Sequence, residues 1–146
     1  MEAPQARQRI VNVPLPARAG DKDFEHVAHV ILEPFIRSFK PDLVLVSAGF
    51  DGHWNDPITT LGLSTAGFYM LSKRLVELAA QHCAGRIVFV LEGGYDPVNL
   101  ANGAAAVFAA LLGSASGPVV DDRMPYAEPV SALAEIDSIR EWHGFE

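Results

Sequence analysis

The chain has 146 residues, 49% of them hydrophobic, and a formal net charge of −7, which fits one domain with an ample buried core. The acidic balance and the absence of a lysine or arginine cluster predict no nucleic-acid partner, and the single cysteine, Cys83, excludes an internal disulfide framework and a cysteine-based zinc site. The sequence has no hydrophobic signal core and no apolar run near the ~18 residues that span a bilayer, so we expect no membrane partner and a cytoplasmic location.

Three short apolar runs predict buried β-strands at residues 10–13, 43–46 and 86–91. Each run is rich in valine, isoleucine and leucine and is apolar on both faces. This pattern is typical of parallel strands that are covered by helices on both sides.

Helical patterns lie between the strands. The first is divided or kinked at Pro34, because proline removes a backbone donor; its apolar positions are Phe24, Val27, Ile31, Phe35 and Phe39. The second can be capped by Ser64 or Thr65 and is followed by Gly85; its apolar stripe is Phe68, Leu71, Leu75, Leu78 and Ala79.

Further helices follow the last predicted strand. Asp96 and Pro97 predict a capped start for an alanine-rich helix that reaches Leu112 and stops at Gly113. Beyond it, residues 114–118 read as a small-residue linker and 119–129 as irregular. A final helix is predicted at residues 130–142, with one apolar face made by Leu133, Ile136 and Ile139.

The order of elements predicts an α/β fold with a parallel sheet in a three-layer α/β/α arrangement, wound by right-handed crossovers. Three strands make a thin sheet, and strands buried on both faces need neighbours on both sides. The sequence therefore indicates part of a larger domain, or a chain that associates.

Two of the predicted strands end in unusual segments, at the edge where parallel sheets bind their ligands. Asp51 directly follows one strand, so its carboxylate either meets a cation or substrate proton or simply caps a turn. Asp51 and His53 together resemble a pair of metal ligands, and imidazole commonly binds zinc. Two ligands separated by one residue need a special loop geometry to reach one ion, so an ordinary loop role is favoured for His53. Asp56 precedes a proline, which favours a role in a turn.

The second segment contains Gly93, Gly94 and Tyr95. Glycines allow a substrate to approach the backbone, and a tyrosine held after such a turn could donate a hydrogen bond to an oxyanion. A Gly-Gly turn followed by a packed tyrosine is the structural alternative. Glu92 could be a general base or could pair with local groups, and the sequence does not decide between them.

Two pairs of acidic residues lie in polar connecting segments. These are Asp21 with Asp23 and Asp121 with Asp122. We interpret both pairs as solvated surface.

Taken together, the strand-end segments resemble the C-terminal part of the histone deacetylase family, in its class II-like and bacterial amidohydrolase branches. The order of the motifs and the helix between them agree, and the resemblance runs from about Ile10 to Gly113. The matching motifs are Ser47-Ala48-Gly49-Phe50-Asp51, Asp56-Pro57 and Leu91-Glu92-Gly93-Gly94-Tyr95.

The resemblance implies an arginase/deacetylase-type fold and a zinc-dependent hydrolysis of N-acetyl amides, on acetylated lysine or acetylated small amines. Asp51 matches one of the zinc ligands of that family, and Tyr95 matches the tyrosine that stabilises the oxyanion. Gly93 and Gly94 match the glycine-rich loop of the acyl channel. Ile58 falls where the family commonly places an apolar residue at the substrate entrance.

The sequence also departs from the family pattern. No pair of adjacent histidines occurs in the chain to act as general base, and the Asp-x-His ligand motif is expected upstream of Met1. Because Asp51 matches the family's single-aspartate motif, His53 is not expected to be a ligand. Alone, the chain should bind zinc poorly and hydrolyse nothing efficiently.

We therefore expect residues 1–113 to be the C-terminal portion of a deacetylase-type domain and residues 114–146 to be a linker and helical tail. Its partners would be the missing N-terminal half or a second copy. The alternatives are a non-catalytic remnant or interaction module of the same fold and, less favoured, a small α/β protein that binds another ligand.

Overall fold

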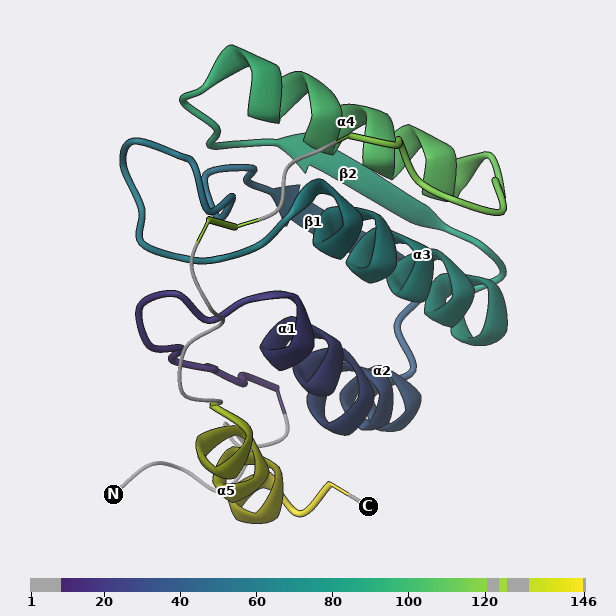
Figure 1. Cartoon of the computed structure of the whole chain (residues 1–146). Coiled ribbons are helices and arrows are strands. Elements are labelled where there is room, and N and C mark those ends of the chain that lie inside the picture. The colour runs from purple at the N-terminus through teal and green to yellow at the C-terminus, as the bar shows by residue number, and fades with distance from the viewer. Residues whose placement is uncertain (1–8, 121–123, 126–131, 146) are drawn as a thin grey trace.

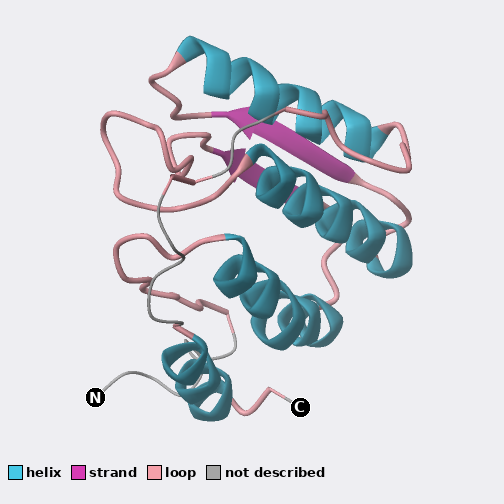
Figure 2. Ribbon diagram, in the orientation of Figure 1, coloured by secondary structure: helices cyan, strands magenta, loops and turns pink. Residues whose placement is uncertain are grey.

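The computed structural model describes residues 9–120, 124–125 and 132–145. Helices and a small sheet form an α/β arrangement, shown in Figures 1 and 2. The elements in chain order are α1 (Asp21–Val27), the π-helical turn η1 (Ala28–Leu32), α2 (Glu33–Phe39), β1 (Val44–Ala48), α3 (Thr65–His82), β2 (Ile87–Leu91), α4 (Pro97–Leu111) and α5 (Leu133–His143).

The sheet consists of β1 paired in parallel with β2, in a register that places Val44 opposite Ile87 and Ala48 opposite Leu91. Two of the three predicted strands are thus confirmed. The prediction of a strand at residues 10–13 is wrong, because this segment has no strand beside it to pair with in the described structure. Val11 and Val13 instead pack against a core cluster that contains residues of α1, η1 and α5.

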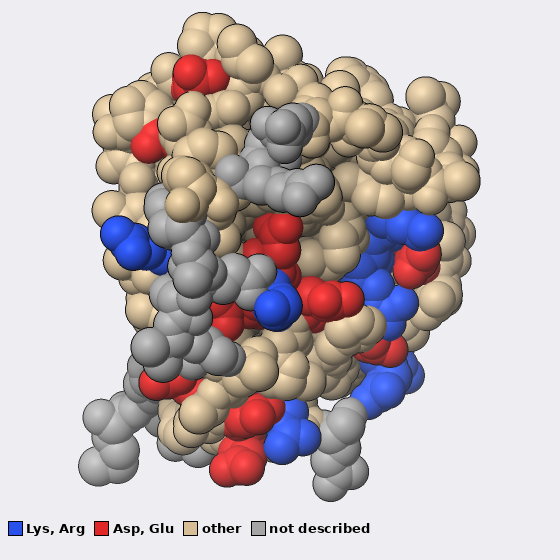
Figure 3. All heavy atoms as spheres, in the orientation of Figure 1, with Lys and Arg blue, Asp and Glu red and all other residues tan. Residues whose placement is uncertain are grey.

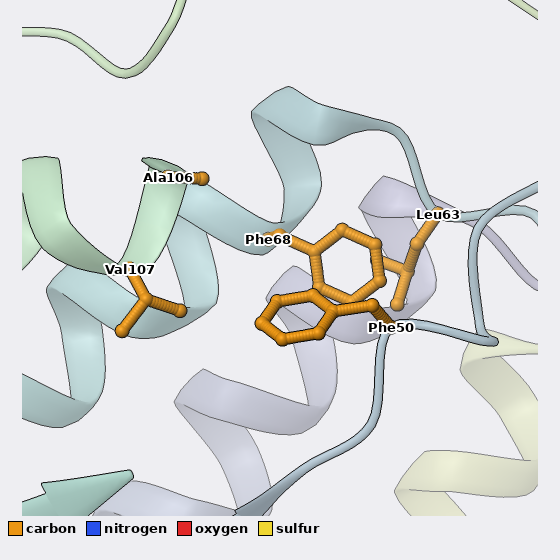
Figure 4. Packing of buried hydrophobic residues seen from close by; sticks show 5 residues of the cluster. All are labelled: Phe50, Leu63, Phe68, Ala106 and Val107. Atoms are coloured by element: carbon orange, nitrogen blue, oxygen red, sulfur yellow. The ribbon is translucent and has the colours of Figure 1, made fainter. Parts of the chain in front are cut away.

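Helices α3 and α4 lie next to each other against one face of the sheet. Figure 4 shows the core that they enclose, with the rings of Phe50 and Phe68 side by side. The centroids of these two rings are 5.3 Å apart. This cluster consists of Phe50, Leu63, Phe68, Ala106 and Val107, and Ala48 and Phe89 pack against it from the strands. Every second residue of each strand therefore points toward the helices, and these residues form the buried face of the sheet.

The opposite face of the sheet is open. Leu45 on β1 is 67% exposed, and Val88 and Val90 on β2 are nearly half exposed. The described residues thus supply two of the three expected layers and leave an apolar sheet face uncovered. Within the same described ranges, no helix is both long and apolar enough to cross a membrane.

Pro34 divides the first helical segment, as predicted. It occupies the first turn of α2, directly after η1, where the ladder of backbone hydrogen bonds widens to π geometry. Because proline has no backbone N–H to donate to the preceding turn, a bulge at this point is the expected accommodation.

The predicted helix starts are confirmed for α3 and α4. The Ser64 hydroxyl accepts a hydrogen bond from the Gly67 N–H at 3.2 Å. The Asp96 carboxylate accepts from the backbone N–H groups of Val98 and Asn99 at 3.0 and 2.8 Å. These bonds satisfy donors that a helix start otherwise leaves without partners.

The interpretation of Asp21 and Asp23 as solvated surface is wrong. Asp21 accepts bonds from the backbone N–H and the hydroxyl of Ser64, at 2.9 and 2.6 Å, and so ties the start of α1 to the start of α3. Asp23 is buried and accepts from the N–H groups of Gly20 and Ala132, which fixes the start of α5 against α1. Asp121 and Asp122 lie outside the described residues.

The final helix, α5, forms within the predicted segment. Ile136 is fully buried, and Ile139 packs beside it against the cluster with α1 and η1. Leu133, which was expected on the same buried face, is 39% exposed. Residues 130 and 131, with which the predicted helix began, lie outside the described residues.

Arg74 on α3 binds two carboxylates, Glu33 on α2 and Glu77 one turn further along α3. Its hydrogen bond lowers the pKa of Glu33, although partial burial acts in the opposite direction. Burial lowers the pKa of Arg74, but the hydrogen bonds to both carboxylates outweigh it and raise that pKa. The network therefore joins α2 to α3 in its charged form.

Replacing Arg74→Met should lower the free energy of unfolding by roughly 1 kcal/mol, because the methionine keeps the packing of the side-chain stem and loses the ion pairs. Because the pKa of Glu33 is lowered, this contribution is present at neutral pH and fades as the pH falls through the folded-state pKa. Urea unfolding at neutral and acidic pH measures both effects. Lys73→Met, which removes an exposed cation from the same helix, is the control; an equal loss in the two variants would contradict this role.

Candidate functional site

The strand-end segments meet at one edge of the sheet. Figure 2 shows both arrowheads pointing to the same side, where the loops gather. The parallel ladder continues past the strands, since Glu92 donates its N–H to the Ala48 carbonyl at 3.1 Å and Phe50 donates to the Gly93 carbonyl at 2.8 Å. These two bonds place the residues that follow in neighbouring loops.

The carboxylate of Asp51 lies directly against Gly93. A Cβ atom added at residue 93 would stand 2.8 Å from the Asp51 carboxyl carbon, and one added at Gly49 would stand 2.8 Å from an Asp51 oxygen. Only glycines leave room for the carboxylate there, because real Cβ atoms do not approach other atoms so closely. No donor in the described residues hydrogen-bonds this half-buried carboxylate, so its lone pairs remain available to a ligand.

Tyr95 is held by its backbone and exposes its side chain. Its N–H donates to the Asp56 carboxylate at 2.9 Å, whereas 57% of the residue is accessible to solvent. Gly94, immediately before it, has a φ of 137°, which a residue with a side chain rarely adopts. The phenol makes no hydrogen bond within the described part of the chain, so it is free to meet a substrate.

Asp56 joins the two strand-end loops. It is buried, and its other oxygen accepts from the Ile58 N–H at 2.9 Å. The prediction of a role in a turn is confirmed by that bond. The bond to Tyr95 across 39 residues was not predicted, because nothing in the sequence around Asp56 indicates a partner so far along the chain.

Ile58 lies on the same loop and is 66% exposed. Its position therefore permits contact with a bound molecule. Glu92 is exposed as well, and only its backbone takes part in the ladder.

His53 is buried inside the loop instead of facing solvent. Its exposed fraction is 1%, its ring stacks on Phe68, and its Nδ1 atom accepts from the Asn55 N–H at 3.2 Å. The ring is therefore enclosed by its own loop and by α3, and its expected role as a non-ligand stays a prediction.

A metal ion at this edge of the sheet would need several donor side chains close together. In the residues that the structure describes, no group of three or more histidine, cysteine, aspartate or glutamate side chains could hold one. Asp51 provides a single carboxylate with open lone pairs, which suits zinc as one ligand of several. The fit is therefore partial, and any ion held here needs further ligands.

Comparisons with known proteins give the family. The sequence model described as "Histone deacetylase domain" matches residues 2–111. The chain belongs to the histone deacetylase family.

Relatives of this deacetylase-family chain are found among plants and archaea. It is 41% identical to "Histone deacetylase 10, chloroplastic" of Oryza sativa over 136 residues, 91% of this chain and 31% of that protein. It is 47% identical over 86 residues to a "Probable deacetylase" of Archaeoglobus fulgidus, covering 59% of this chain and 24% of the relative. The chain thus spans about a quarter to a third of the length of these relatives.

Solved histone deacetylase structures share the fold. The structure of the histone deacetylase Clr3 superposes with a TM-score of 0.74 at 28% identity, over 93% of this chain and 22% of that one. The HDA15 HD domain superposes with a TM-score of 0.70 at 27% identity, over 88% of this chain and 32% of the other. The predicted arginase/deacetylase-type α/β fold with a parallel sheet is thereby confirmed.

Replacing Gly93→Ala should displace the Asp51 carboxylate, because the new methyl carbon would stand 2.8 Å from the carboxyl carbon. The NMR shift of the Asp51 carboxyl carbon measures this directly. Gly113→Ala is the control: its methyl group would meet nothing within 4 Å, its φ of 67° makes the alanine strained, and the loss of a glycine there should still leave that signal in place. An unmoved Asp51 signal in Gly93→Ala would show that this glycine does not set the carboxylate position.

Proposed function

We propose that this chain supplies part of the active site of a zinc-dependent deacetylase that hydrolyses N-acetyl amides. One observation carries the proposal: the Asp51 carboxylate lies against Gly93, in the loop that ends at the exposed Tyr95. Membership of the histone deacetylase family supports it. The rest of the site would come from outside this chain, which alone would be inactive.

In this proposal Asp51 is one ligand of a Zn²⁺ ion. Bound zinc polarises a carbonyl and lowers the pKa of its water. This chain contributes the position of the carboxylate, for which Gly93 and Gly49 leave space. No donor among the described residues engages it.

Tyr95 is the proposed oxyanion donor. Its exposed phenol would donate a hydrogen bond to the substrate carbonyl, most strongly when negative charge develops there in the transition state. Gly93 and Gly94 would border the acyl group at backbone distance, and Ile58 would meet the substrate at the entrance. Acetylated lysine and acetylated small amines are the proposed substrate class.

The proposed partner is the complementary part of a deacetylase domain, or a second copy of this chain. The open face of the sheet supports this, since Leu45, Val88 and Val90 expose apolar side chains there. Helix α4 adds to it: its sequence contains no charged residue, and the region of α4 is almost free of charge in Figure 3. Such a surface is stabilised by association.

A second candidate function is an interaction module of the same fold without catalysis, which the uncovered sheet face also favours.

The cytoplasmic location stays a prediction.

A chimera tests the catalytic proposal. It replaces the matched segment of the rice relative with this chain and is assayed for acetate release from acetyl-lysine peptides. Tyr95→Phe in the chimera should slow the reaction by about 10²–10³-fold, the usual cost of losing one oxyanion donor.

Tyr69→Phe is the matched control, because its hydroxyl donates to the Ser114 carbonyl at 2.7 Å and its loss should affect stability instead of rate. An unchanged rate in Tyr95→Phe would refute the assigned role. A chimera without activity, with zinc present and the fold intact, would favour the interaction module.

The open sheet face predicts self-association of the 146-residue chain. Replacing Leu45→Thr and Val88→Thr should shift sedimentation velocity profiles toward the monomer, because the exposed apolar area falls while strand propensity is kept. Val119→Thr, at a fully exposed loop position, should leave the profile unchanged. A monodisperse monomer of the unaltered chain would contradict the prediction.

A further inference from the structure

The carboxylate of Asp56 uses both of its oxygens on backbone amides of two different loops. Oδ1 accepts from Ile58 and Oδ2 accepts from Tyr95, each at 2.9 Å. The residue is 7% exposed, so these bonds are made where water competes little and where an unpaired carboxylate would be costly. This carboxylate is therefore committed to holding the two backbones at a fixed separation.

A second polar contact joins the loop that contains Asp56 to the segment that follows Tyr95. Asn99, in the first turn of α4, is buried and donates its side-chain N–H to the Asn55 carbonyl at 3.4 Å. Asp96, which caps α4, fixes the backbone on the other side of Tyr95. The Asp56 loop is thus joined to the first turn of α4, on the C-terminal side of Tyr95, as well as to Tyr95 itself.

The phenol itself has no such support. Most of Tyr95 is exposed, and its hydroxyl makes no hydrogen bond among the described residues. The point from which the side chain leaves, and the direction of its Cα–Cβ bond, are set by the backbone, which follows Gly94 at positive φ and is anchored by Asp56. A donor to a transition-state charge must be held in place before reaction, since small displacements cost large factors in rate.

We propose that Asp56 is the positioning residue for Tyr95, an inference that rests on the proposed function of Tyr95. Asp56 acts through the Tyr95 N–H and does not touch the substrate. The same bond pair holds Ile58, so the entrance residue and the oxyanion donor move as one unit.

Amide hydrogen exchange of the 146-residue chain, followed by NMR, tests the anchoring without any activity. Asp56→Asn keeps the shape but has one acceptor oxygen, and its NH₂ group faces a second donor, so it can serve only one of the two amides. Exchange at Tyr95 or at Ile58 should accelerate about tenfold or more, while amides of the β1–β2 ladder keep their protection.

Asp42→Asn is the charge-matched control, because Asp42 is exposed and, among the described residues, only its backbone carbonyl accepts a bond, from Arg86. Unchanged exchange at both amides in Asp56→Asn would overturn the proposal. If that variant does not fold, scalar coupling across the hydrogen bond, between the Tyr95 amide nitrogen and the Asp56 carboxyl carbon, is measured in the unaltered chain. Its absence would overturn the proposal as well.

A double-mutant cycle in the chimera distinguishes positioning from general support of the fold. Asp56→Asn should lower kcat about 10-fold or more with little change in KM, and should cost almost nothing further when Tyr95→Phe is already present. An equal loss in both backgrounds would overturn the proposal. A normal rate in Tyr95→Phe would instead refute the function of Tyr95 and leave the anchoring measured by exchange standing.

Discussion

The structure depends on one interaction, the parallel pairing of β1 with β2 and its continuation beyond the last strand residues. Because the ladder extends through the Phe50 N–H to the Gly93 carbonyl, the two loops leave the sheet next to each other. Asp51 can then lie on a residue without a Cβ atom, and Asp56 can reach the backbone of Tyr95. A shift of register would separate these groups, since each loop begins at a fixed distance from its strand.

The same pairing leaves the sheet incomplete. Its inner face is closed by α3 and α4, whose side chains enclose Phe50, but its outer face presents apolar residues to solvent. A face of this kind carries a free-energy cost that association removes. The open sheet and the partial donor set both support the proposal that the described residues are one side of a larger arrangement. The chain spans about a quarter to a third of the length of its relatives, which fits that proposal.

Local chemistry made much of the fold predictable. Asp96 followed by Pro97 specifies a helix start in two residues, and Pro34 specifies a break. The prediction of a strand at residues 10–13 failed because a strand is defined by its neighbour, which composition does not reveal. In the site, strand ends and motif spacing were enough to propose Asp51 and Tyr95, and their roles stay predictions. The roles of Asp23 and Asp56 could not, because their partners lie 109 and 39 residues away and depend on the assembled fold.

The central claim is that this chain brings one metal-binding carboxylate to a deacetylase site. The most direct test is the zinc content of the dialysed chimera, measured by mass spectrometry with Asp51 intact and with Asp51→Asn. The account predicts about one zinc per intact site, retained in the Asp42→Asn control and largely lost in Asp51→Asn. Full retention of zinc in Asp51→Asn would contradict it.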